Sequence, residues 1–246
     1  MVTNILKGIK AYFGTLSLIS KLKLWKYFVI PVSISLLTGI SILVLAFSLS
    51  DNVAQLIIKF WIWDWGANTF GMVSQVIGGL LILVLGFVFH KHIVMALSAP
   101  FMSPVSQKIE KHLLGKTIYV YRETTFMQQL LRGIRINFRN LLRELSLIIP
   151  LILLSFIPVI GVVFTILIFF VQAYYVGFGN MDYTMERHFD YKESIQFVKQ
   201  HSGTAIGNGI IFMCLLFIPV IGFVLSMPIA VVAASTETVR ILHQPK

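Results

Sequence analysis

Lysine and arginine side chains carry the chemistry that this sequence offers. Six of them precede or line the regions that look functional: Lys23, Lys26, Arg132, Arg135, Arg139 and Arg143. Such cations, together with the free N–H groups of helix N-termini, can attract and hold a tetrahedral anion without acid–base chemistry. They can equally bind phospholipid headgroups. The sequence therefore predicts contact with anions and leaves open whether these are solutes or anionic lipids.

Residues typical of enzymes and metal sites are missing. None of the sequence patterns HExxH, GxxxxGK[ST], GxGxxG and GxSxG occurs. His90 and His92 point apart if they lie on a helix, so we expect them at the membrane interface and not around a metal. The single cysteine, Cys214, forms no disulfide framework and is expected to be a buried small apolar residue. We predict no enzyme, no cofactor and no metal.

The composition is that of an integral membrane protein. Of the 246 residues, 57% are hydrophobic and only 12% are charged, and the mean hydropathy is +0.85. A formal net charge of +10 then indicates topology and lipid contact before it indicates nucleic acid, which we do not expect as a partner.

A repeated hexapeptide, Phe-Ile-Pro-Val-Ile-Gly, divides the last hundred residues. It occurs at 156–161 and 217–222, near the middle of two long stretches without charge. Pro158 with Gly161, and Pro219 with Gly222, should each break a helix, which predicts helical hairpins over 145–178 and 204–236. The first leg would rise about 16 Å against a hydrocarbon core of about 30 Å, so it would cross only partway. The alternative is a single Pro-kinked span in each stretch.

The other elements follow from apolar runs and periodicity within one membrane domain, 1–246. The predicted segments begin with an interfacial helix over 4–20, a first span over 27–49 and an aromatic connector over 51–71 with Trp61, Trp63 and Trp65. A second span over 72–97 continues to about 114, where Gly115 can cap it. An amphipathic helix over 126–144 with one face of arginines follows, and a cytoplasmic connector covers 182–201. The fold class is thus an all-α membrane protein with two long transmembrane helices, two hairpins and interfacial helices.

Charge placement predicts the orientation. If the two spans go out and back and each hairpin returns to its own side, nineteen of the twenty Lys and Arg residues lie on one side. By the positive-inside rule this side, with the N-terminus, is cytoplasmic.

Several local sequences, in this order, resemble the CysZ-type sulfate permeases and their eukaryotic etoposide-induced relatives. They are Ala99-Pro100-Phe101, Lys108-Ile109-Glu110, Met181-Asp182-Tyr183, His188, Tyr191-Lys192-Glu193 and Met227-Pro228-Ile229-Ala230-Val231. The resemblance implies two long spanning helices with two partly penetrating hairpins, an oligomer in the bacterial inner membrane, and inward passage of sulfate for cysteine synthesis.

The resemblance also implies an anion-binding segment just before the first span. The family's Gly-Leu-Arg-Arg segment falls on Lys23-Leu24-Trp25-Lys26, where only Lys26 keeps a matching charge. Asp182 matches the family as well, but a carboxylate repels anions, so we expect it to pair with a nearby cation.

Two functions are compatible with these features. The first is a sulfate-like anion permease or channel, with Lys23, Trp25 and Lys26 binding the anion and the four arginines of 126–144 concentrating it. The second is a non-transporting membrane protein that organises lipids or partner proteins.

Overall fold

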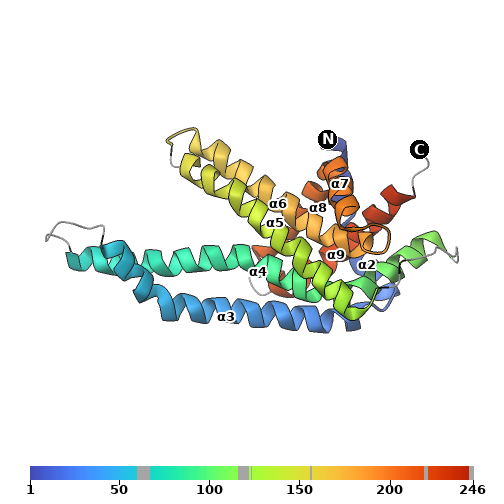
Figure 1. Cartoon of the computed structure of the whole chain (residues 1–246), viewed down its shortest axis with the longest axis horizontal. Coiled ribbons are helices and arrows are strands. Elements are labelled where there is room, and N and C mark those ends of the chain that lie inside the picture. Colours follow the sequence, from blue (N-terminus) through green and yellow to red (C-terminus); the bar gives the residue numbers. More distant parts are fainter. Residues whose placement is uncertain (60–66, 116–121, 123, 156, 219–220, 244–246) are drawn as a thin grey trace. The chain divides into compact units, whose positions relative to one another are not determined.

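The computed structural model describes residues 1–59, 67–115, 122, 124–155, 157–218 and 221–243. In these ranges regular structure is helical throughout, which confirms the predicted all-α class. The helices are α1 (Val2–Lys10), α2 (Thr15–Lys21), α3 (Trp25–Ile58), α4 (Ala67–Leu114), α5 (Phe126–Ser155), α6 (Gly161–Met185), α7 (Tyr191–Gln200), α8 (Ser202–Leu216) and α9 (Ile221–Leu242) (Figure 1). Four of them are long and apolar enough to cross a membrane: Trp25–Ile58, Thr69–Leu114, Gly161–Met185 and Val224–Leu242. Trp61, Trp63, Trp65 and Pro219 lie outside the described residues.

The chain forms two compact units. One comprises Ser35–Lys91, and the other comprises Met1–Ile34 with His92–Lys246. In the first, α3 and α4 approach closely where glycines leave room, because a Cβ added at Gly78 would meet the Ser50 carbonyl and one added at Gly86 would meet the Ile42 side chain. Apolar side chains such as Phe47 are exposed on this unit, as expected of helices that face lipid.

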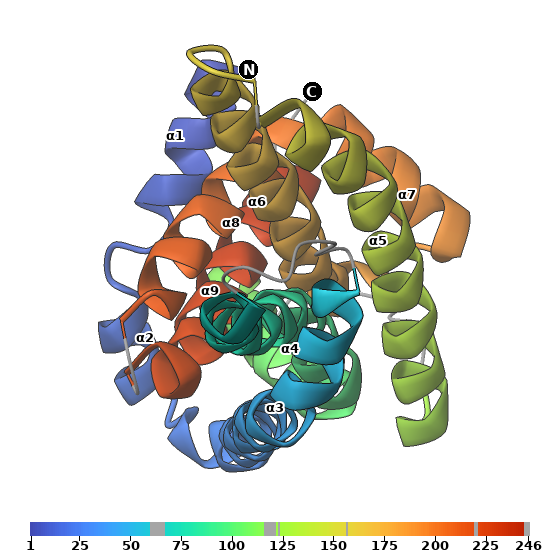
Figure 2. The same ribbon diagram turned by 90° about the vertical axis from the view of Figure 1, so that its left-hand side faces the viewer.

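In the larger unit, α5 and α6 run side by side as one hairpin, and α8 and α9 form another (Figures 1 and 2). Both hairpins reverse with the same hydrogen bond, since the N–H of Gly161 donates to the Ile157 carbonyl and that of Gly222 to the Ile218 carbonyl, each at 2.8 Å. An added Cβ at Gly161 would clash with the Ser155 carbonyl. The turn therefore requires glycine at that position.

Helices α6 and α8 cross backbone to backbone. An added Cβ at Gly177 would overlap the Ala205 carbonyl, and one at Gly209 would overlap the Ala173 carbonyl. On its other side α8 receives α1, where Gly203 and Gly207 lie against Asn4 and Ile5. The close packing expected at Gly203 and Gly207 is thus confirmed.

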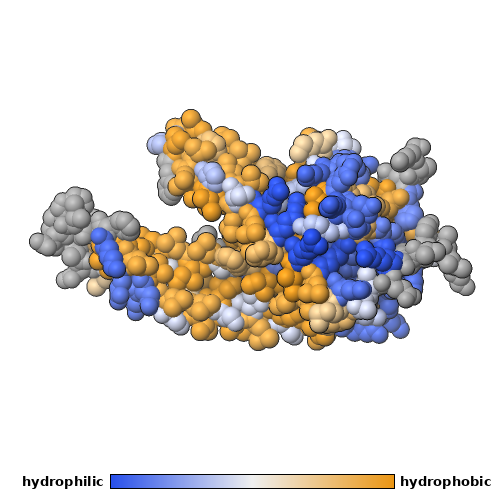
Figure 3. Space-filling view, in the orientation of Figure 1, coloured by the Kyte–Doolittle hydropathy of each residue, from blue (hydrophilic) through white to orange (hydrophobic). Residues whose placement is uncertain are grey.

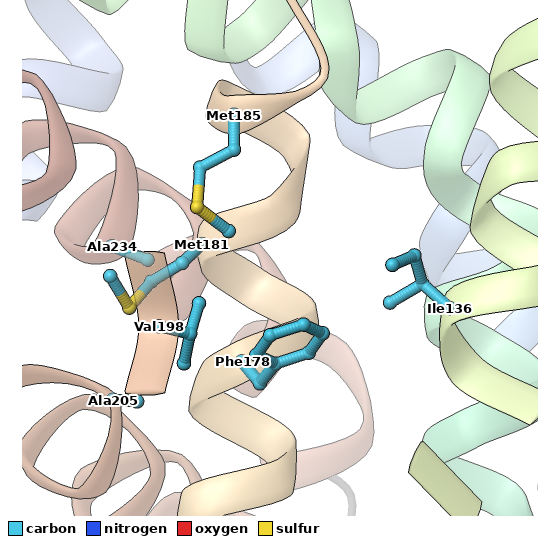
Figure 4. Packing of buried hydrophobic residues seen from close by; sticks show 7 residues of the cluster. All are labelled: Ile136, Phe178, Met181, Met185, Val198, Ala205 and Ala234. Atoms are coloured by element: carbon cyan, nitrogen blue, oxygen red, sulfur yellow. The ribbon is translucent and has the colours of Figure 1, made fainter. Parts of the chain in front are cut away.

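Buried side chains from several helices meet around α6. The cluster comprises Ile136, Phe178, Met181, Met185, Val198, Ala205 and Ala234 (Figure 4). Ile136 projects from α5 toward Phe178, whereas Val198 comes from α7 and Ala234 from α9. The core of the larger unit therefore joins both hairpins to α7.

Some elements differ from the sequence prediction. The helix expected over 4–20 is two helices, because Gly14 adopts a left-handed conformation with φ of 84° between them. The arginine-bearing helix and the first hairpin leg form one continuous helix, α5. The connector expected over 182–201 contains the end of α6 and all of α7, whose N-terminus carries a capping box between Asp190 and Glu193.

Two expectations about single residues are corrected. Cys214 is exposed and not buried. Gly115 has φ of 72° at the end of α4, which confirms its expected place as a helix cap.

We predict that Gly209→Ala destabilises the protein, whereas Gly79→Ala does not. At Gly209 the new methyl overlaps the backbone of α6, and such overpacking typically costs about 1 to 3 kcal/mol; at Gly79 the nearest atom would be the Ser50 Cβ at 3.7 Å. Thermal unfolding in detergent measures the difference. Equal melting temperatures for the two variants would contradict the packing described above.

Candidate anion-binding site

The segment between α2 and α3 presents three exposed side chains on a buried anchor. Leu24 is fully buried, and its N–H donates to the Ile19 carbonyl at 2.9 Å. On either side of it Lys23, with φ of 51°, and Trp25 and Lys26, at the start of α3, are exposed. The hydrogen bond from Trp25 Nε1–H to the Ser20 hydroxyl is long, at 3.4 Å, and therefore weak. The predicted anion-binding side chains therefore lie together on the surface.

A fourth residue joins this group from α4. The ammonium of Lys108 lies 5.0 Å from the centre of the Tyr27 ring, and that of Lys26 lies 5.3 Å from it. Both distances are within the range of cation–π attraction. Our sequence reasoning did not place Lys108 at the site, although it lies in a motif that carried the family resemblance.

Arg132, the first arginine on the α5 face, forms an ion pair within the protein. Arg132 is largely buried and binds Asp182 with two nitrogens, Nη2 to Oδ1 at 2.9 Å and Nε to Oδ2 at 3.2 Å. It also donates to the Phe189 carbonyl and the Ser194 hydroxyl. Burial alone would lower the pKa of Arg132, but Asp182, together with Glu186 and Asp190, more than offsets this, so the pKa is raised. The expected role of Asp182 as partner of a cation is confirmed.

The other three arginines differ from one another. The Arg135 guanidinium stacks 4.0 Å from the Tyr191 ring centre. Arg139 lies 5.5 Å from the Phe178 ring and donates to the Asn140 side chain at 2.8 Å. Arg143 is exposed. Arg135 and Arg143 are therefore the members of this row most available to ions in solution.

A buried ionic network ties α4 to the segment after α6. Glu110, with no exposed surface, accepts from Arg187 Nη2 at 3.0 Å and from His188 Nε2 at 2.7 Å. Arg187 also donates to the Ser106 hydroxyl at 2.7 Å. Hydropathy and periodicity did not reveal this network, yet Glu110 and His188 belong to the motifs that carried the resemblance.

The two histidines near the end of the second span are buried within the protein. Each is 3% exposed; His90 Nε2 lies 3.2 Å from the Ser35 carbonyl, whereas His92 Nε2 lies 2.7 Å from Glu144. These partners lie on different helices, Ser35 on α3 and Glu144 on α5. In the described part of the chain no group of three or more His, Cys, Asp or Glu side chains could hold a metal ion.

Glu186 follows α6 and is unusual among the acidic residues. It is 2% exposed, and burial raises its pKa to about 7 although Ser103, Arg187 and Arg132 oppose that shift. Its Oε1 atom is buried without a hydrogen-bond partner. A neutral carboxylic acid is thus stable at this position near neutral pH.

Comparison with known proteins identifies relatives over most of the chain. The family described as sulfate transporter CysZ/etoposide-induced protein 2.4 matches residues 11–228. A protein of Vibrio parahaemolyticus serotype O3:K6 (strain RIMD 2210633), named sulfate transporter CysZ, is 29% identical over 141 residues. This match covers 56% of the present chain and 57% of the relative.

We predict that Asp182→Asn destabilises the fold strongly. The substitution leaves the Arg132 guanidinium buried without its counter-ion, a loss of about 3 kcal/mol or more. Asp190→Asn is the matched control, because asparagine caps a helix as well as aspartate does. Chemical unfolding in detergent measures both, and an Asp182→Asn variant as stable as the control would show that the pair contributes nothing.

We predict that Glu186 makes the protein less stable as pH rises from 4.5 to 7. Its pKa is raised from 4.5 to about 7 in the folded state, so the folded protein binds an extra proton in this range. The contribution of Glu186 to the free energy of unfolding is fully present below pH 4.5 and is lost as the pH rises through 7. The loss amounts to about 3 kcal/mol in total. The free energy of unfolding of Glu186→Gln, measured at the same pH values, should lack this component. Parallel curves for the two proteins would refute the assignment.

Proposed function

The chain belongs to the family of sulfate transporter CysZ and etoposide-induced protein 2.4, and from this premise we propose that it is a permease or channel for sulfate-like anions. It acts in the cytoplasmic membrane of a bacterium, with its N-terminus in the cytoplasm. It moves sulfate inward for sulfur assimilation, and it works as a homo-oligomer.

The exposed cationic group before the first span is the observation that supports this proposal best. By the sequence resemblance described above, Lys23, Trp25 and Lys26 correspond to the family's Gly-Leu-Arg-Arg segment. Lys108 adds a further charge at the Tyr27 ring that Lys26 also approaches. Lysine offers an oxyanion a compact point charge, whereas arginine offers a planar fork of donors. We therefore expect weaker discrimination among tetrahedral anions than an arginine pair would give.

The exposed arginines of α5 have a supporting role in this proposal. Arg135 and Arg143 raise the local concentration of anions by their field, and Arg139 contributes in part. Arg132 acts differently from the original expectation, because its ion pair with Asp182 holds the helices together and neutralises its charge.

A second function is favoured by the N-terminal helices. Exposed Leu6, Phe13 and Leu16 lie near Lys7 and Lys10, an arrangement that suits a helix at the membrane surface. A non-transporting protein that organises anionic lipids or partner proteins would use the same surface.

Uptake of radioactive sulfate into proteoliposomes tests the first function. We expect saturable uptake by the wild type, competition by thiosulfate more than by chloride, and at least about tenfold lower uptake for Lys26→Gln, a loss typical of one charged contact. Lys10→Gln, which removes an exposed lysine elsewhere, is the matched control.

The possible outcomes separate the alternatives. Equal uptake by Lys26→Gln and the control would remove Lys26 from the anion site. No flux of sulfate, thiosulfate, phosphate or chloride through the wild type would favour the lipid-organising function instead.

A further inference from the structure

An open pocket of about 540 Å³ lies in the larger unit, and its described lining includes neither Lys23 nor Lys26. Its walls come from the start of α5, the segment after α6 and the start of α7. It is lined by Arg122, Thr124, Gln128, Gln129, Leu131, Arg132, Arg135, Glu186, Asp190, Tyr191 and Lys192. We call it the α5–α7 pocket. Figure 3 shows hydrophilic side chains gathered over α7 and the neighbouring half of α5.

Among the described residues that line this pocket, cations outnumber carboxylates. Four Lys and Arg side chains face two carboxylates there, and the charge of Arg132 is already matched by Asp182 from outside the lining. Of the two carboxylates, Asp190 uses one oxygen to accept the Glu193 N–H in the cap of α7. Within the described lining, Arg122, Arg135 and Lys192 therefore leave an excess of positive charge.

A second hollow of about 350 Å³ continues the same surface. It shares Arg122, Thr124 and Gln129 with the α5–α7 pocket and adds Arg187, Ser103, Pro104 and Gln107. The described residues that line it include no carboxylate. The two hollows together supply guanidinium, hydroxyl and amide donors, which is the donor set that oxyanions prefer.

Glu186 provides an independent indication of a ligand. It lines the α5–α7 pocket, it is 2% exposed, and its Oε1 has no hydrogen-bond partner. Around it are Arg132 on α5, Asp182 on α6, Ser103 on α4, and Arg187, with Asp190 and Lys192 across the pocket. A protonated carboxyl here would donate to an oxyanion, and a buried polar atom left without a partner is otherwise costly.

We propose that the α5–α7 pocket is a second oxyanion site, in which Arg135, Lys192 and Arg122 bind a tetrahedral sulfate or phosphate group and protonated Glu186 donates a hydrogen bond to it. The group is either a free ion or the phosphate of a phospholipid headgroup. Only the identity of the free ion rests on the proposed function; the presence of the site does not.

Equilibrium dialysis of the full-length protein in neutral detergent tests the site without requiring transport. Radioactive sulfate and phosphate are the probes, and Lys23→Gln/Lys26→Gln is the background, so that remaining binding is not due to the first site. In that background, adding Arg135→Gln/Lys192→Gln should weaken binding at least about tenfold, because two charged contacts are lost. Adding Lys111→Gln/Lys199→Gln removes two exposed charges outside the pocket and should change binding less than about twofold.

Substitution of Glu186 should strengthen oxyanion binding, whereas substitution of the cations should weaken it. At pH 8, where the carboxyl is mostly ionised, Glu186→Gln should bind sulfate or phosphate about threefold or more tightly, since a repelling charge becomes an amide that can donate. Unchanged or weaker binding by this variant, in a sample with normal thermal stability, would overturn the role of Glu186.

Dihexanoyl phosphatidic acid distinguishes the two sources of the oxyanion. Binding of inorganic sulfate or phosphate that Arg135→Gln/Lys192→Gln abolishes identifies a free-ion site, whereas binding of the short-chain lipid alone, lost in the same variant, identifies a headgroup site. The proposal fails if none of the three probes binds in a way that depends on Arg135 and Lys192, or if the Lys111/Lys199 control loses as much. Neither result depends on flux, so a protein that transports nothing could still have this site.

Discussion

The backbone contact between α6 and α8 is the constraint on which the larger unit depends. Within a membrane the hydrophobic effect does not drive one helix onto another, so association relies on close packing and on polar contacts. Gly177 and Gly209 allow the two backbones to touch, and beside them the Asn180 amide donates to the Asn208 side chain at 2.9 Å. Asn208 then donates to the Ala230 carbonyl of α9 and accepts from the Tyr12 hydroxyl at its own carbonyl. One crossing thereby brings together α6, α8, α9 and the N-terminal segment.

With α6 fixed in this way, the polar end of the unit can hold buried charges. Asp182 and Arg187 lie three and eight residues beyond Gly179, and each meets an opposite charge from another helix, Arg132 of α5 or Glu110 of α4. Such pairs stabilise a particular arrangement more than they add to total stability, because desolvation offsets much of their attraction. The network therefore defines how α4, α5 and α6 meet at this end.

Much of the fold was predictable because its causes are local. Apolar runs of membrane length, the Pro and Gly of the repeated hexapeptide, and the small residues at 203 and 207 indicate helices, turns and close contacts without reference to distant residues. The division of 4–20 at Gly14 was missed because the apolar periodicity continues through the break. The continuity of α5 was missed because the change from amphipathic to apolar sequence near residue 145 looks like a boundary, although the helix runs on through Pro150.

The candidate site was predictable only in part. Lys23, Trp25 and Lys26 were found from charge and resemblance. Lys108 and Arg187 contact residues more than seventy positions away in the sequence, and Glu186 is unusual because it is buried. The spacing of residues along the sequence predicts neither property. Arg132 shows the limit most clearly. Its place in a regular row of arginines indicates an exposed cation, and only the position of Asp182 shows that it is the member committed to an internal partner.

The four hydrogen bonds of Arg132 also have a mechanical consequence. The Arg132 guanidinium on α5 donates to the carboxylate near the end of α6, to the carbonyl that precedes α7 and to a hydroxyl on α7 itself. Separating any of these elements would strip a largely buried charge of its partners. We therefore expect the ends of α5, α6 and α7 that meet at Arg132 to move together in any conformational change.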